Sequence, residues 1–359
     1  MDLNITDSSH LVFGAGLIGC YLGGAMCDRG LLVKLVCRDT VKTKLQQGMQ
    51  LTDYLGHATN LSPNMLFADL LNENNPKSSS YKFIWLTVKC TGITQALLDL
   101  TTYVSADTVI LCCQNGLGSD ALVKQAFPKN LVLRVMVPFN VVELKAGHFH
   151  RGSQGQLTIE SSYTSDNSVT NQHLSQSLVE LLNCELLPVT QCADMTALLW
   201  AKLQLNLGNS VNALADIPVK AMLEQRAYRI IIACLMKELL MVTEQLGISL
   251  PKLTAVPAKW LPIVLELPDF LFKRIANKML AIDPNVRTSM WCDVSQGKPT
   301  EIDFLNGAIV EHAQLLNLDC PANRLMVQMI KSQNTKVLNT LRLAISAKDM
   351  LALLTRVTA

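Results

Sequence analysis

The stretch that decides the fold is HLVFGAGLIG, residues 10–19, near the start of a 359-residue chain. Residues 10–13 predict a short strand, and residues 17–29 predict a helix that begins directly after a glycine-rich turn. Residues 31–37 are again apolar and predict a second strand. A strand, a G-x-G-x-x-G turn, a helix and a strand in close succession are the context that a dinucleotide-binding fingerprint requires. The sequence therefore predicts an N-terminal α/β domain of the Rossmann type.

The glycine-rich turn is the first candidate binding element. Gly14, Gly16 and Gly19 permit a tight turn and let the backbone approach a pyrophosphate at the helix N-terminus. Leu17 and Ile18, which open this helix, complete the predicted cofactor contacts of the turn. The alternative is a glycine-rich turn with a purely structural role.

The end of the second strand indicates which dinucleotide is bound. NAD-binding sites usually place an acidic residue there for the ribose 2′-hydroxyl. Here Arg38 follows the strand, and a guanidinium can bind a 2′-phosphate through two hydrogen bonds. We therefore expect NADP(H) as the cofactor. One alternative is NAD, because Asp39, the next residue, is acidic. Another alternative is that Arg38 is a solvated loop residue with no contact to the cofactor.

Two further predicted strands end in polar residues. Residues 83–88 are followed by Lys89, and residues 109–113 are followed by Gln114 and Asn115. Ligands of open α/β sheets bind outside the carboxyl ends of the strands. We therefore expect Lys89 and Asn115 to contact a ligand. The alternative for Asn115 is that its Asn-Gly pair only makes a turn.

The remainder of the first half is expected to complete this domain, which we assign to residues 1–193. His148 and His150 have no acidic or thiolate partner at ligand spacing, so no metal site is expected. The patterns predict sheet strands over 132–138, 147–150, 156–160 and 186–189, a helix over 174–182, and a Ser/Thr/Asn-rich loop over 161–172.

Composition excludes several classes of function. Hydrophobic residues make up 49% of the chain, charged residues 17%, and the formal net charge is +2. A charge so close to zero gives no electrostatic case for a nucleic-acid partner or an anionic membrane. The eleven cysteines have no C-x-x-C spacing, which favours a reducing, cytoplasmic location over a disulfide scaffold. We expect neither a secretory signal nor a transmembrane helix.

From residue 194 onward the pattern becomes helical, so we expect an all-α second domain over 194–359. Residues 251–283 are rich in proline and predict an irregular insertion or lid with two helical pieces. The apolar periodicity predicts helices over 198–214, 221–246 and 321–333, followed by a tail over 336–359 with an amphipathic helical pattern.

The helix predicted over 198–214 carries an unusual polar row. Lys202, Asn206 and Asn209 recur at helical spacing and share one face of an otherwise apolar helix. Burying an unpaired ammonium is costly, so such a row needs partners or a cleft. We interpret the row as one wall of a site, with Lys202 as its reactive group. The alternative is a lysine that extends from a core helix beside two hydrogen-bonded amides.

A second polar block lies at residues 289–303, which read SMWCDVSQGKPTEID. Thr300 is a candidate helix N-cap, with Asp303 at the capping-box position of a helix that we expect to reach residue 316. Glu301 then lies in the first turn. The alternative to a functional role for Glu301 is that it complements the helix dipole, worth about 0.3–1 kcal/mol.

Five blocks of this sequence together resemble the ketopantoate reductases (2-dehydropantoate 2-reductases), over residues 10–331. The last two blocks are specific in combination, whereas the first alone is not. The blocks are GAGLIG at 14–19, the strand that ends in Lys89, QNG at 114–116, KLQLN at 202–206, and SMWCD with TEIDFLNG between 289 and 307.

The resemblance implies a role for each matching residue. Lys202 would be the general acid that protonates the carbonyl oxygen as hydride arrives, and Glu301 would orient Lys202 or accept a hydrogen bond from the substrate. The pyrophosphate of the cofactor would be held by Gly14, Gly16 and Gly19, and its 2′-phosphate by Arg38. Lys89 and Asn115 would line the junction of cofactor and substrate. The substrate hydroxyl and carboxylate would be held by Asn206, Ser289 and Glu301.

The implied activity is the NADPH-dependent reduction of 2-dehydropantoate to pantoate, a step toward pantothenate and coenzyme A. Reduction of another branched or bulky 2-oxo acid is one alternative, and a non-catalytic NADP-binding sensor is another. The family often carries an amide eight residues after the lysine, where this chain has Ser210. Asn209 or Asn212 would then replace it. A homodimer is compatible with the apolar second half of the chain.

Overall fold

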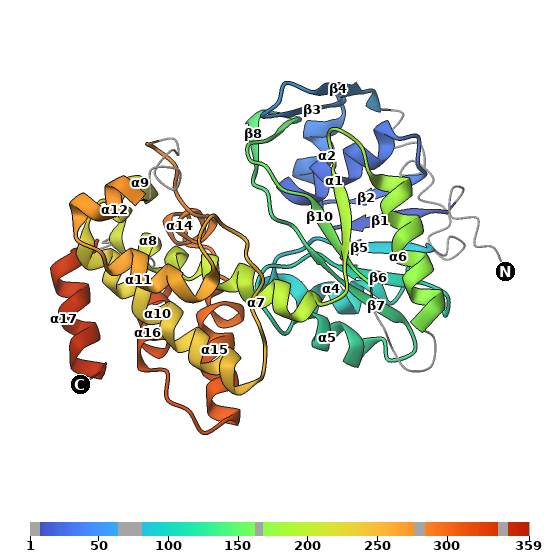
Figure 1. The fold of residues 1–359 in the computed structure, drawn as a ribbon. Helices are drawn as coiled ribbons and strands as arrows, with labels where there is room; N and C mark the ends of the chain where they lie inside the picture. The colour runs from blue at the N-terminus through green and yellow to red at the C-terminus, as the bar shows by residue number, and fades with distance from the viewer. Residues whose placement is uncertain (1–7, 64–80, 162–167, 276–283, 337–343, 359) are drawn as a thin grey trace. The chain divides into compact units, whose positions relative to one another are not determined.

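The computed structural model describes residues 8–63, 81–161, 168–275, 284–336 and 344–358. The chain divides into two compact units, residues 1–195 and residues 196–359. The first unit is an α/β domain and the second is built from helices (Figure 1). The predicted fold class is therefore confirmed.

A seven-stranded sheet forms the centre of the N-terminal unit, with the strand order β11-β10-β7-β6-β5-β1-β2. Neighbouring strands run parallel, except that β10 is antiparallel to β7. The strands are β1 (His10–Phe13), β2 (Val33–Val36), β5 (Phe83–Leu86), β6 (Val109–Cys112), β7 (Leu131–Met136), β10 (Leu157–Glu160) and β11 (Val189–Cys192).

The central strands are apolar along their whole length because helices cover both faces of the sheet. Every residue of β1, β5 and β6 is buried. One face packs against α1 (Leu17–Asp28) and α6 (Ser168–Leu182). The opposite face packs against α4 (Ile93–Leu100) and α5 (Ser119–Ala126).

A second sheet of four strands, in the order β4-β3-β9-β8, lies beside the first. Its position corrects the prediction that residues 147–150 complete the main sheet. Gly147 instead turns the chain between two antiparallel strands, and β9 then pairs in parallel with β3. The strands are β3 (Met49–Asp53), β4 (Ala58–Leu61), β8 (Val141–Lys145) and β9 (His148–Arg151).

Two boundaries in the N-terminal unit differ from the predicted ones. Helix α6 begins at Ser168, so the loop predicted over 161–172 is wrong for its last five residues, and 162–167 lie outside the described residues. The strand predicted over 186–189 is β11, which begins at Val189. Leu186 and Leu187 are buried in the core ahead of that strand, which explains their apolar pattern.

The C-terminal unit continues α7 (Met195–Asn206) and adds further helices. The single helix predicted over 198–214 is interrupted at Leu207, and the helix predicted from residue 221 is interrupted before Arg226. The other helices are α8 (Gly208–Ala215), α9 (Val219–Leu223), α10 (Arg226–Gln245), α11 (Leu261–Glu266), α12 (Asp269–Ile275), α14 (Ser289–Ser295), α15 (Asn306–Leu315), α16 (Pro321–Lys336) and α17 (Ala347–Thr358), with short 3₁₀ helices η2 (Ala258–Trp260) and η3 (Ile302–Phe304).

The described part of the proline-rich segment contains the two predicted helical pieces, α11 and α12, and its role as an insertion or lid stays a prediction. Its helices α11 and α12 lie against α10 through the buried guanidinium of Arg229. Arg229 donates hydrogen bonds to the carbonyl oxygens of Leu265 (3.0 Å) and Leu267 (2.8 Å) and pairs with Asp269 (2.8 Å). Residues 276–283 of the segment lie outside the described residues.

Two expectations about helix ends also have clear outcomes. The predicted N-cap at Thr300 is wrong, because η3 and α15 replace the single helix expected there. The side chain that caps a helix in this region is Thr288, which accepts a hydrogen bond from the Trp291 backbone at the start of α14. The amphipathic helix of the tail is confirmed in α17, whose Met350 and Leu354 are buried.

Candidate active site

The glycine-rich turn between β1 and α1 has the geometry that a bound pyrophosphate needs. Gly14 has a φ of 109° and lies so close to β5 that a Cβ would stand 2.6 Å from the Val88 nitrogen. A Cβ on Gly19 would overlap the Gly14 carbonyl, so that glycine permits close packing of α1 on the turn. A Cβ on Gly16 would meet no atom within 4 Å, which leaves this part of the backbone accessible to a ligand.

The N-terminus of α1 adds hydrogen-bond donors at the same place. Gly16 is its N-cap and supplies no side-chain cap. The first helical residues, Leu17, Ile18 and Gly19, therefore direct their backbone N–H groups toward the open side of the turn. Unsatisfied N–H groups at a helix N-terminus favour an anion such as a phosphate. These features fit a dinucleotide.

The other predicted cofactor residues lie along the same edge of the sheet. Strands β6, β5, β1 and β2 are neighbours and run parallel, so their carboxyl ends share one edge. Asn115, Lys89 and Arg38 follow β6, β5 and β2, respectively. The chain leaves β1 toward β2 on one side and returns to β5 on the other, which makes this a topological switch point, the usual ligand position in such sheets.

Arg38 is exposed at the end of β2, where a 2′-phosphate would be read. Its backbone forms the N-cap of α2 (Asp39–Leu45), and its side chain makes no contribution to that cap. Asp39 is also exposed and lies in the first turn of α2. The geometry leaves both the predicted phosphate contact and the alternative of a solvated loop residue open, so the role of Arg38 stays a prediction.

Thr87 is a residue of this edge that the sequence interpretation missed. Its hydroxyl contacts the carbonyl oxygens of Gly14 (2.7 Å) and Phe13 (3.2 Å), so it holds the glycine-rich turn against the end of β5. A threonine inside a strand of high β-propensity carries no separate signal in the sequence. Only the pairing of β1 with β5 shows its partner.

The polar row predicted over Lys202, Asn206 and Asn209 is divided in the structure: Lys202 and Asn206 lie on one side of α7, whereas Asn209 lies in α8, after the break at Leu207. The opposite side is occupied by packing contacts, because the Trp200 ring meets His312 of α15 at 5.1 Å and Gln204 donates to the Ala258 carbonyl at 3.0 Å. Lys202 and Asn206 each follow one of these residues by two positions, which is about 200° around a helix. Both are half-buried, as expected for a row that borders a site.

The structure distinguishes Asn209 from Asn212, the two candidates for the missing family amide. Asn212 is fully buried, and its side chain forms hydrogen bonds within the helical unit. It donates to the Ile217 carbonyl at 2.7 Å and accepts from the backbone and hydroxyl of Thr288, both at 3.1 Å. Asn209 is half-buried. Asn209 is therefore the better candidate for the missing family amide.

Ser289 is brought next to this amide pair. It is exposed at the start of α14, directly after Thr288, whose hydroxyl also approaches the Asn209 carbonyl at 3.5 Å. Glu301 is buried and precedes η3. The neighbouring Thr300 hydroxyl is buried and has no hydrogen-bond partner among the described residues. A pairing of Glu301 with Lys202 stays a prediction.

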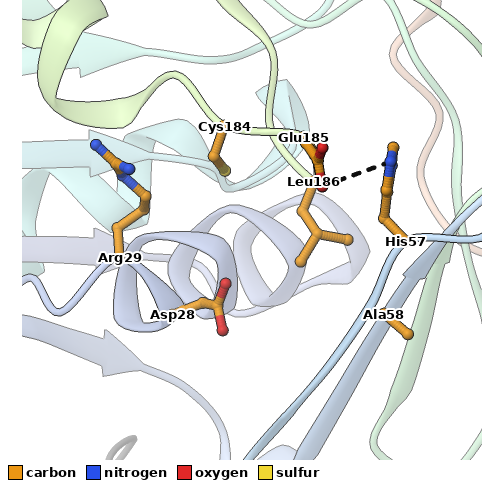
Figure 2. Close-up of a pocket in the computed structure, with 7 residues that line it drawn as sticks. All are labelled: Asp28, Arg29, His57, Ala58, Cys184, Glu185 and Leu186. Carbon is orange, nitrogen blue, oxygen red and sulfur yellow. Dashed lines mark ion pairs between the residues drawn. The ribbon is translucent and has the colours of Figure 1, made fainter.

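A cavity of about 630 Å³ lies elsewhere in the N-terminal unit, at the C-terminal end of α1 (Figure 2). None of the predicted site residues lines it. Its charged groups are of both signs, and His57 lies 3.5 Å from the Glu185 carboxylate. The lining residues are Asp28, Arg29, His57, Ala58, Cys184, Glu185 and Leu186.

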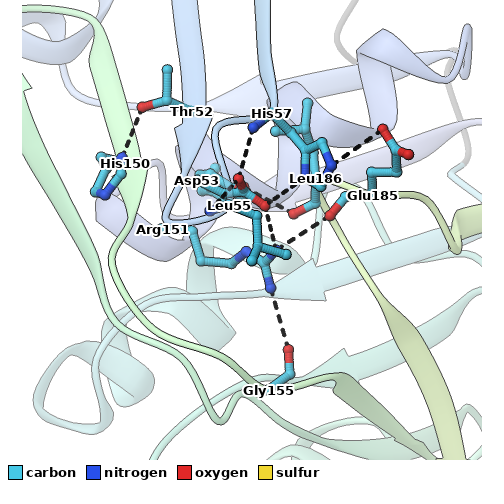
Figure 3. A network of polar contacts seen from close by, with 10 residues as sticks. Thr52, Asp53, Leu55, His57, His150, Arg151, Gly155, Glu185 and Leu186 are labelled. Atoms are coloured by element: carbon cyan, nitrogen blue, oxygen red, sulfur yellow. Dashed lines mark hydrogen bonds and ion pairs between the residues drawn. The ribbon is translucent and has the colours of Figure 1, made fainter.

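A network of polar contacts lies beneath this cavity (Figure 3). Buried Asp53 accepts hydrogen bonds from Arg151 (2.8 Å) and His57 (3.0 Å), and Arg151 also donates to the Glu185 carbonyl (3.2 Å). Burial by itself raises the pKa of Asp53, but the hydrogen bonds from His57, Arg151 and the backbone lower it to about 2. The network ties the small sheet to the segment before β11.

Within the described ranges, no three histidine, cysteine, aspartate or glutamate side chains converge in a way that would hold a metal ion. The described helices include none that is both long and apolar enough to span a membrane.

Two family sequence profiles match the chain. One is described as ketopantoate reductase PanE/ApbA and matches residues 10–162; the other is described as the C-terminal part of the same protein and matches residues 194–334. The chain belongs to the ketopantoate reductase family. The resemblance seen in the five sequence blocks is thus confirmed, and the family is one of oxidoreductases.

Relatives of this ketopantoate reductase family member are distant but match over nearly their whole length. The 2-dehydropantoate 2-reductase of Streptococcus pyogenes serotype M6 is 23% identical over 91% of this chain and 98% of its own. That of Pyrococcus horikoshii is 24% identical over 90% of this chain and 97% of its own.

Solved structures share the fold. A PanE/ApbA family ketopantoate reductase from Ralstonia eutropha JMP134 has a TM-score of 0.72 at 23% identity, covering 91% of this chain and 99% of that chain. D-mandelate dehydrogenase in complex with NADH and anilino(oxo)acetate also has a TM-score of 0.72, at 16% identity, covering 92% and 99%. At these identities the likeness shows the common fold.

Proposed function

We propose that this protein is an NADPH-dependent reductase that converts 2-dehydropantoate to pantoate. The observation that carries the proposal is the combination of a ligand-accessible glycine-rich turn at the switch point of the sheet with the half-buried row of Lys202 and Asn206 in the helical unit. In this proposal the unit of residues 1–193 binds the dinucleotide, and the unit of residues 194–359 supplies the substrate-binding and catalytic groups.

When bound, the dinucleotide supplies the hydride that reduces the ketone carbon. Its pyrophosphate is held by the backbone of Gly14, Gly16 and Gly19 and the N-terminus of α1, and its 2′-phosphate by Arg38. The carbonyl oxygen gains negative charge as its carbon is reduced, and a nearby ammonium both stabilises that charge and donates a proton. Lys202 has this role, so the proton of its ammonium ends on the product hydroxyl.

The remaining polar residues hold the substrate. Asn206 and Ser289 donate hydrogen bonds to the hydroxyl and carboxylate of the 2-oxo acid, and Glu301 orients Lys202 or accepts from the substrate hydroxyl. Lys89 and Asn115 contact the substrate where it adjoins the cofactor. The donors among these groups match a small anionic ketone, since amides, hydroxyls and ammonium groups are what a carboxylate and a developing alkoxide require, whereas Glu301 acts as an acceptor.

A second candidate keeps the chemistry and changes the substrate. D-mandelate dehydrogenase has the same fold and carries NADH and anilino(oxo)acetate in its structure, so the fold accommodates a 2-oxo acid with an aromatic substituent. The deciding experiment is NADPH oxidation with 2-dehydropantoate beside other 2-oxo acids, phenylglyoxylate included. Turnover confined to another 2-oxo acid would support the proposed mechanism and contradict 2-dehydropantoate as the substrate. Binding of NADPH without turnover on any acid would favour the sensor.

Replacing Lys202 tests the catalytic assignment. We expect Lys202→Ala to lower kcat by about 10²–10⁴-fold, the usual contribution of a general acid, while the Kd for NADPH stays within about twofold of the wild-type value, the scatter expected for a change outside the cofactor site. Lys237→Ala is the control, because this lysine is exposed and pairs with Glu266. Turnover unchanged in Lys202→Ala would remove Lys202 from the mechanism.

Replacing Arg38 tests the choice of dinucleotide. A bidentate arginine–phosphate contact is made only to NADPH, so Arg38→Ala should lower the ratio of kcat/KM for NADPH to that for NADH by about tenfold or more. Arg29→Ala is a matched control, since Arg29 is an exposed arginine at the opposite end of α1. If the ratio of kcat/KM for NADPH to that for NADH did not change, Arg38 would not contact the 2′-phosphate, and the alternative of a solvated loop residue would hold.

The proposal extends to location and assembly. The structure describes all eleven cysteines and joins none of them in a disulfide, which supports a reducing, cytoplasmic environment. A dimeric ketopantoate reductase from Staphylococcus aureus has the same fold, with a TM-score of 0.65 at 19% identity, covering 91% of this chain and 99% of that chain. We propose a homodimer for this chain too, to be checked by sedimentation of the purified protein.

A further inference from the structure

Gln114 opens the QNG block, and the proposed function gives its side chain no role. It is buried at the carboxyl end of β6, directly before Asn115. Its side-chain amide donates two hydrogen bonds across to the end of β5, to the carbonyl oxygens of Leu86 (2.7 Å) and Val88 (3.2 Å). The Ser119 hydroxyl lies 3.4 Å from its amide oxygen. One side chain thus joins the two strand ends that carry Lys89 and Asn115.

Two other side chains extend this connection to the whole cofactor edge. The Cys90 thiol donates to the Asn115 carbonyl at 3.1 Å, so the loops after β5 and β6 are joined a second time. The Thr87 hydroxyl contacts the Gly14 carbonyl at 2.7 Å and joins the loop after β5 to the glycine-rich turn after β1. The loops after three adjacent strands are therefore connected by side chains that do not themselves occupy the open side of the edge.

We propose that Gln114 is a positioning residue for the reaction, the centre of a clamp with Thr87 and Cys90 that fixes Lys89 and Asn115 relative to the glycine-rich turn before any ligand binds. The inference rests on the proposed function and deepens it. Loops at strand ends are otherwise the mobile parts of a sheet, and small misplacements of binding groups are costly for a reaction that depends on orientation. The clamp supplies that orientation from within the fold.

Asn130 offers a matched control for this proposal. Its amide also donates to two backbone carbonyls, of Ser105 (2.7 Å) and Thr108 (2.9 Å), but at the amino ends of β6 and β7. Gln114→Met and Asn130→Leu each remove a two-bond amide while keeping the side-chain size. We expect similar losses in melting temperature for the two variants, because each removes two hydrogen bonds from a side-chain amide to backbone carbonyl groups.

Only Gln114→Met should impair the site. We expect it to weaken NADPH binding and to lower kcat/KM by about tenfold or more, and to speed amide hydrogen exchange in residues 87–92 and 114–118, with no such changes in Asn130→Leu. Thr87→Val is a smaller change and should speed amide hydrogen exchange in residues 14–19. This variant tests the clamp if Gln114→Met does not fold. Equal exchange and equal NADPH affinity in both amide variants would overturn the clamp.

The same experiment separates this proposal from the proposed function. Hydrogen exchange reports on the clamp whether or not the protein turns over a substrate. A wild-type protein that neither binds NADPH nor reduces any 2-oxo acid would refute the proposed function, while faster exchange in Gln114→Met alone would still support the structural clamp.

Discussion

His10 illustrates how a single residue of this fold acquires unusual chemistry. It is the first residue of β1 and is fully buried. Its Nδ1 accepts a hydrogen bond from the Trp85 indole at 3.1 Å, and its ring stacks on Phe83 at 5.0 Å. Because Nδ1 is the acceptor, the neutral ring carries its proton on Nε2. Burial lowers the pKa of His10 from its ordinary value of 6.5 to about 4.

This histidine should make stability depend on pH. In the unfolded chain it takes up a proton near pH 6.5, whereas in the folded protein it stays neutral down to about pH 4. Its contribution is therefore complete above pH 6.5 and is lost as the pH falls toward 4, by up to about 3 kcal/mol. His10→Asn keeps an acceptor for Trp85 and cannot titrate, so its free energy of unfolding should fall less over this range.

Urea unfolding at a series of pH values measures the difference. His173→Asn is the control, since His173 is exposed and should leave the pH dependence of the wild type unchanged. Identical slopes for the wild type and His10→Asn between pH 6.5 and pH 4 would mean that another group dominates acid destabilisation.

At the scale of elements, one arginine organises the proline-rich segment. Arg229 of α10 is fully buried and donates to carbonyl oxygens of Leu223, Leu265 and Leu267. Its guanidinium also lies over the Phe272 ring at 4.1 Å. These carbonyl groups lie at helix ends or between helices, where intrahelical partners are missing. Arg229 therefore takes the place of backbone donors and holds α11 and α12 on α10.

Removing this guanidinium should be costly. Arg229→Met would leave several buried carbonyl groups without donors, and we expect a loss of about 3 kcal/mol in the free energy of unfolding. Arg226→Met is the comparison, because Arg226 is exposed and donates to the Glu266 carbonyl, and it should cost under about 1 kcal/mol. Similar midpoints in urea for the two variants would show that the segment is held mainly by apolar contacts.

At the scale of the whole molecule, burial decides the reactivity of the thiols. Cys292, on α14, is the exposed cysteine, while the others are buried or half-buried. Burial also raises the pKa of Cys20, Cys27 and Cys320 to about 12. Since the thiolate is the reactive form, these groups should be inert in the folded protein.

Thiol titration tests this expectation. The native protein should react rapidly at one thiol per chain and the denatured protein at all eleven. Cys292→Ser should abolish the rapid phase and leave the melting temperature unchanged, because its side chain is exposed. A rapid phase of several thiols in the wild type would indicate that the folded state opens more readily than the structure implies.

Much of the fold could be predicted because its signals are local. The strand–glycine turn–helix order, the apolar strands and the helical periodicity of the second half depend on neighbours in the chain. The predictions failed where contacts between residues distant in sequence decide the local structure. Residues 147–150 lie in a second sheet because β9 pairs with β3. Thr300 does not cap a helix because the chain there forms η3 before α15.

By itself, the sequence determined the α/β-then-helical organisation, the family, and which residue types can serve a dinucleotide and a 2-oxo acid. Only the tertiary structure decided that the Asn212 side chain is hydrogen-bonded to Thr288, whereas the Asn209 backbone carbonyl faces the Thr288 hydroxyl. It also decided that Gln114 and Thr87 join three strand ends. The physical reason is that a side-chain hydrogen bond depends on distance in space, and the partners of these residues are backbone groups, which carry no signature in the sequence.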